Sequence, residues 1–149
     1  NTITEEKGAE WGALCTPTRS GYAFKGWNTK KDGTGTTITQ NSTAEKNLTV
    51  YAKWIGEFTL TYNSNGGNSC NPETIKKESG ETWGTLCKPT RSGYVFKEWN
   101  TKQDGTGSKV TKNTVASDNV TVYAIWNPIY TLTYNSNGGK IRLCFKQEF

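Results

Sequence analysis

The chain has 149 residues, of which 32 % are hydrophobic and 12 % aromatic, so we expect small cores held by aromatic side chains rather than one large core. It contains no histidine and no methionine, which excludes mechanisms that need an imidazole base, an imidazole metal ligand or a thioether. The lysines behind the net charge of +5 are scattered among acidic residues, so we expect a solvated surface and no nucleic-acid partner.

The sequence predicts neither membrane insertion nor catalysis. No apolar run approaches the roughly 18–20 residues that a membrane helix needs. No pair of carboxylates recurs beside a nucleophile, so we expect no enzyme activity, no catalytic residue and no cofactor. The chain begins at Asn1 rather than at a methionine, which predicts a processed chain or a fragment.

The first third of the chain is a partial copy of residues 73–126. Seven residues recur 72 positions later: Trp11, Cys15, Tyr22, Trp27, Asp32, Tyr51 and Trp54. A tandem period without gaps predicts an array of similar modules of about 72 residues. We therefore divide the chain into an incomplete first unit (1–55), a complete second unit (58–126) and a tail (129–149).

The first half of the second unit contains two predicted strands. Residues 58–62 alternate between bulky apolar side chains and threonine, which is typical of a strand, and the Asn-Gly-Gly sequence that ends at Gly67 favours a tight turn. We expect another strand near residues 74–78. Around residues 82–86 the sequence favours a turn or a short helix.

The second half contains two more predicted strands. Residues 94–99 follow the turn-forming Pro89 and Gly93, and we expect them to form a strand. The Asp-Gly-Thr-Gly sequence that begins at Asp104 predicts a polar turn, because a cation loop would need several more carboxylates. The last strand is expected over residues 119–126.

The tail begins with a copy of the strand that opens the second unit. Residues 130–139 repeat residues 58–67 with one change, and the sequence after Gly139 departs from the repeat. Residues 1–54 correspond only to the later part of a unit. We therefore expect the first unit to lack its first strand and the tail to carry the first strand of a further unit.

The sequence resembles a known family through residues 90–101, the Asp-Gly-Thr-Gly turn, the Val-Thr-Val-Tyr-Ala-Ile-Trp strand at 120–126, and the preceding Tyr-Asn-Ser-Asn-Gly-Gly. Together they resemble the Listeria/Bacteroides repeat, the internalin-type B-repeat of bacterial surface proteins. The resemblance covers nearly the whole chain apart from the last ten residues. It implies a mainly β, β-grasp-like, ubiquitin-related module, used in tandem as an extracellular stalk, spacer or adhesive segment without enzyme activity.

Four cysteines in such an extracellular-type chain predict two disulfides, and four cysteines allow three pairings. Cys15 and Cys87 are equivalent positions, while Cys70 and Cys144 each follow an Asn-Gly-Gly turn. If Cys70 bonds Cys87 within the second unit, the corresponding bond for the first unit joins Cys15 to Cys144. Free buried thiols and a four-cysteine zinc site are the alternatives, although the cysteines lack the usual zinc spacing, and we expect no metal.

A unit without its first strand has unpaired backbone groups at a sheet edge, which invites strand addition. About three residues separate Trp126 from Tyr130, and such a link spans roughly 10–14 Å, so the tail should emerge beside its own second unit. Our hypothesis is that residues 130–139 complete the first unit of a neighbouring molecule. Tyr130, Leu132 and Tyr134 are then the core-facing residues of an assembly strand.

Such a contact, repeated head to tail, does not close on itself and generates a fibre, with Cys144 meeting the neighbour's Cys15. The alternative is that both ends are accidents of proteolysis or cloning in a longer array. The chain is then a monomeric spacer, or a binding module of a cell-surface adhesin that recognises a host protein or a glycan. We expect the six recurring tryptophans to serve the core first, and a glycan-stacking face is the alternative.

Overall fold

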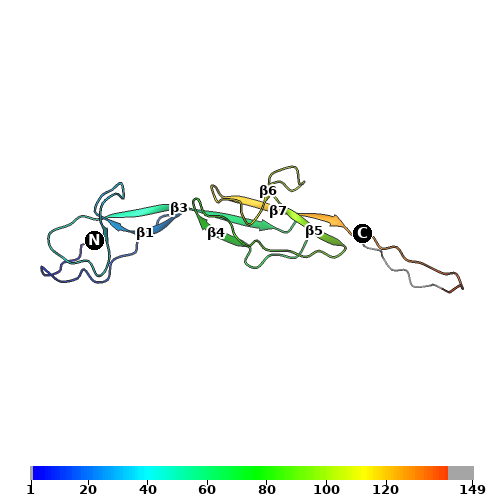
Figure 1. Cartoon of the computed structure of the whole chain (residues 1–149), viewed down its shortest axis with the longest axis horizontal. Coiled ribbons are helices and arrows are strands. Elements are labelled where there is room, and N and C mark those ends of the chain that lie inside the picture. The colour runs from blue at the N-terminus through cyan, green and yellow to red at the C-terminus, as the bar shows by residue number, and fades with distance from the viewer. Residues whose placement is uncertain (1, 141–149) are drawn as a thin grey trace.

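The structure, a computed structural model, describes residues 2–140 and consists of strands joined by turns and irregular segments (Figure 1). No helix occurs within residues 2–140, so the expectation of a mainly β fold is confirmed for that part of the chain. The seven strands are β1 (Tyr22–Asn28), β2 (Thr37–Ile38), β3 (Tyr51–Asn63), β4 (Thr74–Glu78), β5 (Tyr94–Asn100), β6 (Lys109–Val110) and β7 (Val120–Pro128).

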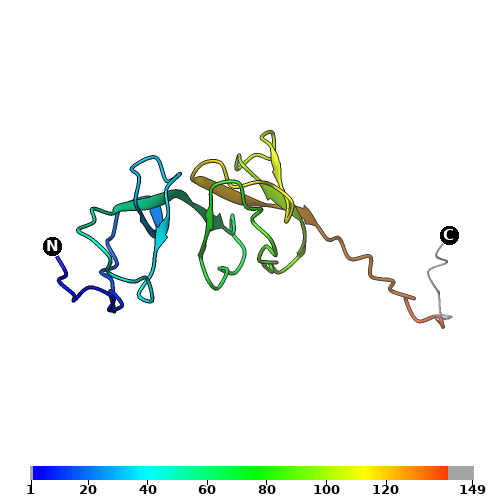
Figure 2. The ribbon, with the colours of Figure 1, turned by 60° about the vertical axis from the view of Figure 1, so that its left-hand side comes forward.

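The strands form one mixed sheet in the order β2-β1-β3-β7-β5-β6, and β4 pairs with β3 outside this path. The pairing of β3 with β7 is parallel, whereas β3 pairs with β1 and with β4 in the antiparallel direction. The first unit, the second unit and the tail follow one another along the long axis of the molecule (Figures 1 and 2).

The strands expected in the second unit are present, at 58–62 within β3, at 74–78 as β4 and at 94–99 within β5. The strand expected over 119–126 is β7, which begins one residue later, at Val120, and ends at Pro128. Residues 82–86, where we expected a turn or a short helix, contain no helix. Thr82 instead forms an isolated antiparallel bridge with Val115.

β3 is a single strand of 13 residues that belongs to both units. Its residues 51–56 pair with β1, residues 57–61 pair with β4, and residues 60–63 lie parallel to β7. From the sequence we expected the first unit to end at residue 55 and the second to begin at residue 58, on either side of the change of partner in β3. The strand runs through because the linking residues Ile55, Gly56 and Glu57 contain neither a proline nor a turn-forming pair.

Two further contacts hold the units together where β3 changes partner. The N–H of Glu57 donates to the carbonyl oxygen of Gly21 at 2.9 Å. Lys25 Nζ lies 2.9 Å from Glu78 Oε2 and so joins β1 to β4. Since an exposed ion pair contributes at most about 1 kcal/mol, the shared strand is the main connection between the units.

The second unit has a continuous core. β3, β5 and β7 contribute Leu60, Trp99 and Val122, which are almost completely buried, and Trp99 Nε1 donates to the carbonyl oxygen of Cys87 at 2.8 Å. The other buried members of this cluster are Tyr62, Cys70, Trp83, Val110, Ala116 and Ala124.

The first unit repeats this architecture where its strands have partners. Trp27 lies opposite Ile38 in the pairing of β1 with β2, as Trp99 lies opposite Val110 in the pairing of β5 with β6. Trp27 Nε1 donates to the carbonyl oxygen of Cys15 at 2.9 Å, the same bond that Trp99 makes in the second unit. The differences between the units therefore lie where a strand is missing from the first.

Candidate functional site

The tail presents three large exposed side chains in the sequence of a core strand. Tyr130, Leu132 and Tyr134 are 87 %, 75 % and 64 % exposed. Their counterparts 72 residues earlier lie in β3, where Leu60 and Tyr62 belong to the core and Phe58 packs against it. The described part of the tail pairs with no strand, and it continues away from the first unit (Figures 1 and 2).

The turn that follows this segment has the same geometry in the tail as in the second unit. Asn65 and Asn137 both have positive φ, at 48° and 44°. The N–H of Asn137 donates to Asn135 Oδ1 at 2.9 Å, just as the N–H of Asn65 donates to Asn63 Oδ1. The tail therefore holds the local conformation of a core strand's turn before any partner is bound.

The first unit lacks the two pairings that the missing strand would supply. Residues 2–6 correspond to β4, yet they form no strand and are exposed, whereas β4 pairs with β3. Residues 48–50 correspond to the start of β7, and they too are unpaired, with Leu48 at 37 % exposure. We call residues 2–6 and 48–50 together the acceptor edge of the first unit, because a strand equivalent to the core segment of β3 would lie between them.

The core of the first unit is less covered than that of the second. Trp11, Trp27, Ile38, Val50 and Ala52 are only partly buried, whereas their counterparts Trp83, Trp99, Val110, Val122 and Ala124 are buried. Ala44 and its counterpart Ala116 are buried in both units. In the second unit these buried counterparts share one core cluster with Leu60 and Tyr62, and the described residues of the first unit contain no equivalent of those two side chains.

Three polar groups of the second unit form hydrogen bonds with residues 59–64, the segment that contains Leu60 and Tyr62. The N–H of Cys87 donates to the Tyr62 hydroxyl at 3.2 Å, and Trp126 Nε1 donates to the carbonyl oxygen of Ser64 at 3.0 Å. Asn119 Oδ1 accepts a hydrogen bond from the N–H of Thr59 at 2.8 Å.

The first unit carries the corresponding groups, from Cys15, Trp54 and Asn47, and the tail carries Tyr134, Ser136 and Thr131. Of these residues, Tyr134 was predicted as part of the assembly strand, Cys15 as a disulfide partner and Trp54 as a core residue. The roles of Asn47, Ser136 and Thr131, and of the edge residues Ile3 and Leu48, were not predicted. Extending the 72-residue comparison to each hydrogen-bond partner would have found them.

The cysteines differ between the units. Cys70 and Cys87 form a disulfide with a Cα–Cα distance of 6.0 Å. Cys15 is exposed and forms no disulfide with a residue in the described part of the chain. The expected Cys15–Cys144 bond involves a residue outside the described residues, so it stays a prediction.

Asp32 and Asp104 organise polar turns. Asp104 Oδ1 accepts hydrogen bonds from the backbone N–H of Thr106 at 2.9 Å and from its hydroxyl at 2.8 Å, and Asp32 is bound by Thr34 in the same way. These bonds, the backbone one foremost, hold the pKa of both carboxyl groups below the usual 3.8. No cluster of three metal-ligating side chains occurs within residues 2–140.

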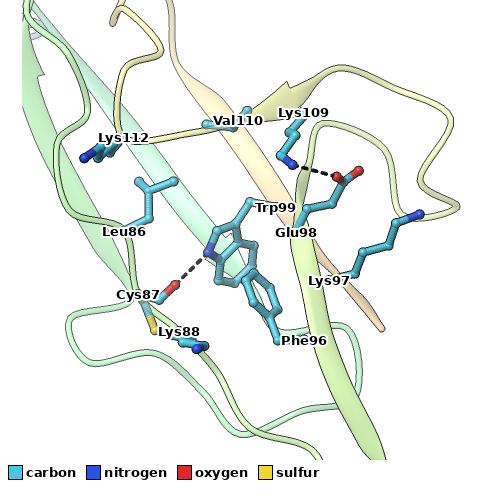
Figure 3. A pocket seen from close by; sticks show the side chains of 10 residues that line it. All are labelled: Leu86, Cys87, Lys88, Phe96, Lys97, Glu98, Trp99, Lys109, Val110 and Lys112. Carbon is cyan, nitrogen blue, oxygen red and sulfur yellow. Dashed lines mark hydrogen bonds and ion pairs between the residues drawn. The ribbon is translucent and has the colours of Figure 1, made fainter. Parts of the chain in front are cut away.

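A shallow pocket of the second unit lies beside Trp99, which is 2 % exposed (Figure 3). Leu86, Phe96 and Val110 form its apolar wall. Lys109 pairs with Glu98 at 3.3 Å, and the side chains of Lys88, Lys97 and Lys112 point in different directions (Figure 3). The charged groups therefore do not converge, and the tryptophan serves the core.

Comparison of the sequence with known protein families finds the same repeat domain in two parts of the chain. The Listeria-Bacteroides repeat domain matches residues 1–53 and 58–125, and the chain belongs to this family. Between residues 2 and 140 no helix is long and apolar enough to cross a membrane.

Two proteins of Evansella cellulosilytica are similar to most of the chain. One, described as a candidate Gly-rich membrane protein, is 31 % identical over 137 residues, which are 88 % of this chain and 16 % of the relative. The other, described as a candidate membrane protein, is 30 % identical over 135 residues, which are 87 % of this chain and 20 % of the relative. The chain thus spans a fifth or less of the length of these relatives.

Proposed function

We propose that the chain is a structural segment of an extracellular or cell-surface protein, built from β-grasp-like modules of about 72 residues that share strands and act as a spacer. The observation that carries this proposal is β3, one strand that ends the sheet of the first unit and begins that of the second. A shared strand limits bending between modules, because bending there would break hydrogen bonds to β1 or to β4. A stiff, extended array is suited to a mechanical role and needs no catalytic site.

The second junction supports the same proposal. β7 ends at Pro128, and the N–H of Ile129 donates to the carbonyl oxygen of Gly93 at 2.8 Å. The Glu57 N–H makes the equivalent bond to Gly21 at the first junction. The tail therefore leaves the second unit along the path by which β3 enters it, and it would continue an array in the same direction.

The test is to interrupt the shared strand. Inserting Gly-Ser-Gly-Ser between Gly56 and Glu57 should let the units tumble independently, measured by ¹⁵N relaxation of the 149-residue chain. The matched control, Lys25→Ala, removes only the exposed ion pair and should leave the units tumbling as one body. Independent tumbling of the units in the unmodified chain would overturn the proposal.

A second candidate function is head-to-tail assembly, and the exposed core-strand residues Tyr130, Leu132 and Tyr134 favour it. Burying each such side chain contributes about 1.5–3 kcal/mol. Association costs about 4–15 kcal/mol, so the strand alone gives a weak contact. A Cys15–Cys144 bond would make that contact permanent under oxidising conditions.

Sedimentation velocity tests the second candidate. The 149-residue chain should form oligomers whose size grows with concentration, and oxidation should stabilise them. A chain that lacks residues 130–149 should sediment as a monomer. A monomeric full chain at every concentration, with no intermolecular disulfide on a non-reducing gel, would leave only the spacer function.

A further inference from the structure

The acceptor edge of the first unit and the tail fit one another in a single register. We infer that residues 130–140 of a second copy occupy the space between residues 2–6 and 48–50, in the register that β3 has in the second unit. This inference rests on the head-to-tail candidate function and adds to it the identity of the occupant and each pair of residues that meet.

The antiparallel side of the register follows from the pairing of β3 with β4. There, Thr59 lies opposite Lys76 and Leu60 opposite Ile75. The same register places Thr131 of the incoming copy opposite Thr4 and Leu132 opposite Ile3. Ile3 is 39 % exposed in the described structure, so it is available for this contact.

The parallel side follows from the pairing of β3 with β7. There, Leu60 lies beside Val120 and Tyr62 beside Val122. The same register places Leu132 beside Leu48 and Tyr134 beside Val50. Both sides of the incoming strand then find partners, and its apolar residues lie over the uncovered core of the first unit.

Three hydrogen bonds between side chains and backbone groups would also form only with the tail sequence in this register. In the proposed complex the Tyr134 hydroxyl accepts the N–H of Cys15, and the N–H of Thr131 donates to Asn47 Oδ1. Trp54 Nε1 donates to the carbonyl oxygen of Ser136. Each bond has its counterpart in the second unit, between residues of the same type.

A close packing contact in the second unit provides a steric test of the proposed register. In the second unit a Cβ on Gly67 would overlap the indole ring of Trp126 and lie 2.8 Å from the carbonyl oxygen of Thr90. Gly139 and Trp54 are the corresponding residues of the tail and the first unit. Only a residue without a side chain fits at position 139 when the tail is bound.

The direction of the tail selects a second copy as its source. β7 ends at Pro128 on the side of the second unit that faces away from the first (Figure 1). The tail continues in that direction in both ribbon views (Figures 1 and 2). The tail therefore points away from the acceptor edge of its own molecule, and in the proposed complex a second copy supplies the strand.

Site-directed cross-linking tests the register. The N–H of Tyr62 donates to the carbonyl oxygen of Glu73, so hydrogen-bonded pairs alternate from there and Thr59 with Lys76 is a closer, non-hydrogen-bonded pair. Thr4→Cys with Thr131→Cys, in a chain that also carries Cys15→Ser and Cys144→Ser, should form disulfide-linked oligomers on mild oxidation. Thr2→Cys with Thr131→Cys is the matched control, because it places the second thiol two residues out of register.

The expected result is at least about tenfold more cross-linked product from the Thr4 variant than from the Thr2 variant. Equal cross-linking in a chain that still associates by sedimentation would overturn the register and leave head-to-tail assembly standing. The absence of both cross-links and association would overturn the assembly as well.

A second variant tests the proposed register without introducing cysteines, through the packing of Gly139 against Trp54. Gly139→Ala should weaken association about tenfold, because the added methyl group meets Trp54 only in the complex. In the free chain its Cβ would lie 3.2 Å from the Ser136 carbonyl oxygen within an exposed turn, so thermal unfolding should not change. Lys140→Ala is the control and should associate as the unmodified chain does. Unchanged association of Gly139→Ala would overturn the inference.

Discussion

Leu60 and Leu132 stand at the same position of two copies of one strand sequence, and their environments are opposite. Leu60 is 0 % exposed between β4 and β7, whereas Leu132 is 75 % exposed. The flanking sequences are nearly identical, so the difference arises from what lies beside each copy. A core strand of this protein is therefore defined by its neighbours on both sides, and a copy without neighbours stays unpaired.

The two leucines give the first prediction. Leu60→Ala should lower the free energy of unfolding of the second unit by about 2–5 kcal/mol, because it leaves a cavity in a closed core. Leu132→Ala should change the stability of the monomer by less than about 0.5 kcal/mol. Urea unfolding of dilute, reduced protein, followed by tryptophan fluorescence, measures both. Equal effects of the two substitutions would contradict the assignment of Leu60 to the core.

The disulfide gives the second prediction. Cys70 and Cys87 enclose a separation of 17 residues, and closing a loop of that size stabilises a fold by about 3 kcal/mol. A chain with Cys70→Ser and Cys87→Ser should lose about 2–4 kcal/mol of unfolding free energy. Cys15→Ser is the matched control and should lose almost nothing in the monomer, since Cys15 is exposed. A loss as large in Cys15→Ser would indicate that Cys15 also has a structural role.

The turn of the second unit gives the third prediction. Asp104 has a lowered pKa because Thr106 donates two hydrogen bonds to its carboxylate. The stabilisation that these bonds give is present above the unfolded pKa and is lost as the pH falls through the lower, folded pKa. Thr106→Val removes the hydroxyl donor and keeps the N–H, so the pKa of Asp104 should rise partway toward 3.8.

Carboxyl chemical shifts measured by NMR between pH 2 and pH 7 follow this change. Asp32 serves as the internal control, because its donors come from Thr34 and are untouched by the substitution. If the pKa of Asp104 stayed where it is in the unmodified chain, the hydroxyl would have no part in the shift.

The sequence predicted the four longer strands of the second unit, and the short strands β2 and β6 were not predicted because two residues are too few to show a pattern. Alternation of apolar and polar residues marks 58–62, and Val122 and Ala124 point to the core as the pattern requires. The continuity of β3 through Gly56 could not be predicted, because a glycine between two strand patterns is equally typical of a bend. Only the pairing of residues 51–56 and 57–61 with different partners reveals one strand.

The sequence could indicate the candidate assembly strand, and it could not indicate the contacts that would fix its register. Tyr130, Leu132 and Tyr134 repeat the residues of a core strand, so the sequence alone predicts that this segment can pair with neighbouring strands. The contacts that lock a register depend on atoms brought together by the fold, such as the ring of Trp126 against Gly67. No periodicity in the chain encodes the distance between those two residues.

The geometry of the second unit predicts how it resists a stretching force. β3 enters the unit from its N-terminal side, β7 leaves it on the C-terminal side, and residues 60–63 lie parallel to residues 120–123. Pulling on the two ends slides these strands past one another, so their hydrogen bonds are loaded together rather than one at a time. We expect the second unit to unfold at a higher force than the first, whose residues 48–50 have no parallel partner.

Single-molecule stretching of the 149-residue chain measures both the force and the extension. The Cys70–Cys87 bond spans 17 residues and holds its ends 6.0 Å apart, so those residues cannot extend until the bond is reduced. Reduction should therefore add about 55 Å to the length released when the second unit unfolds. The first unit, whose Cys15 forms no disulfide with a described residue, should release the same length in both conditions and so serves as the control. A higher unfolding force for the first unit would contradict the parallel pair as the mechanical clamp, because that pair is what the second unit has and the first lacks.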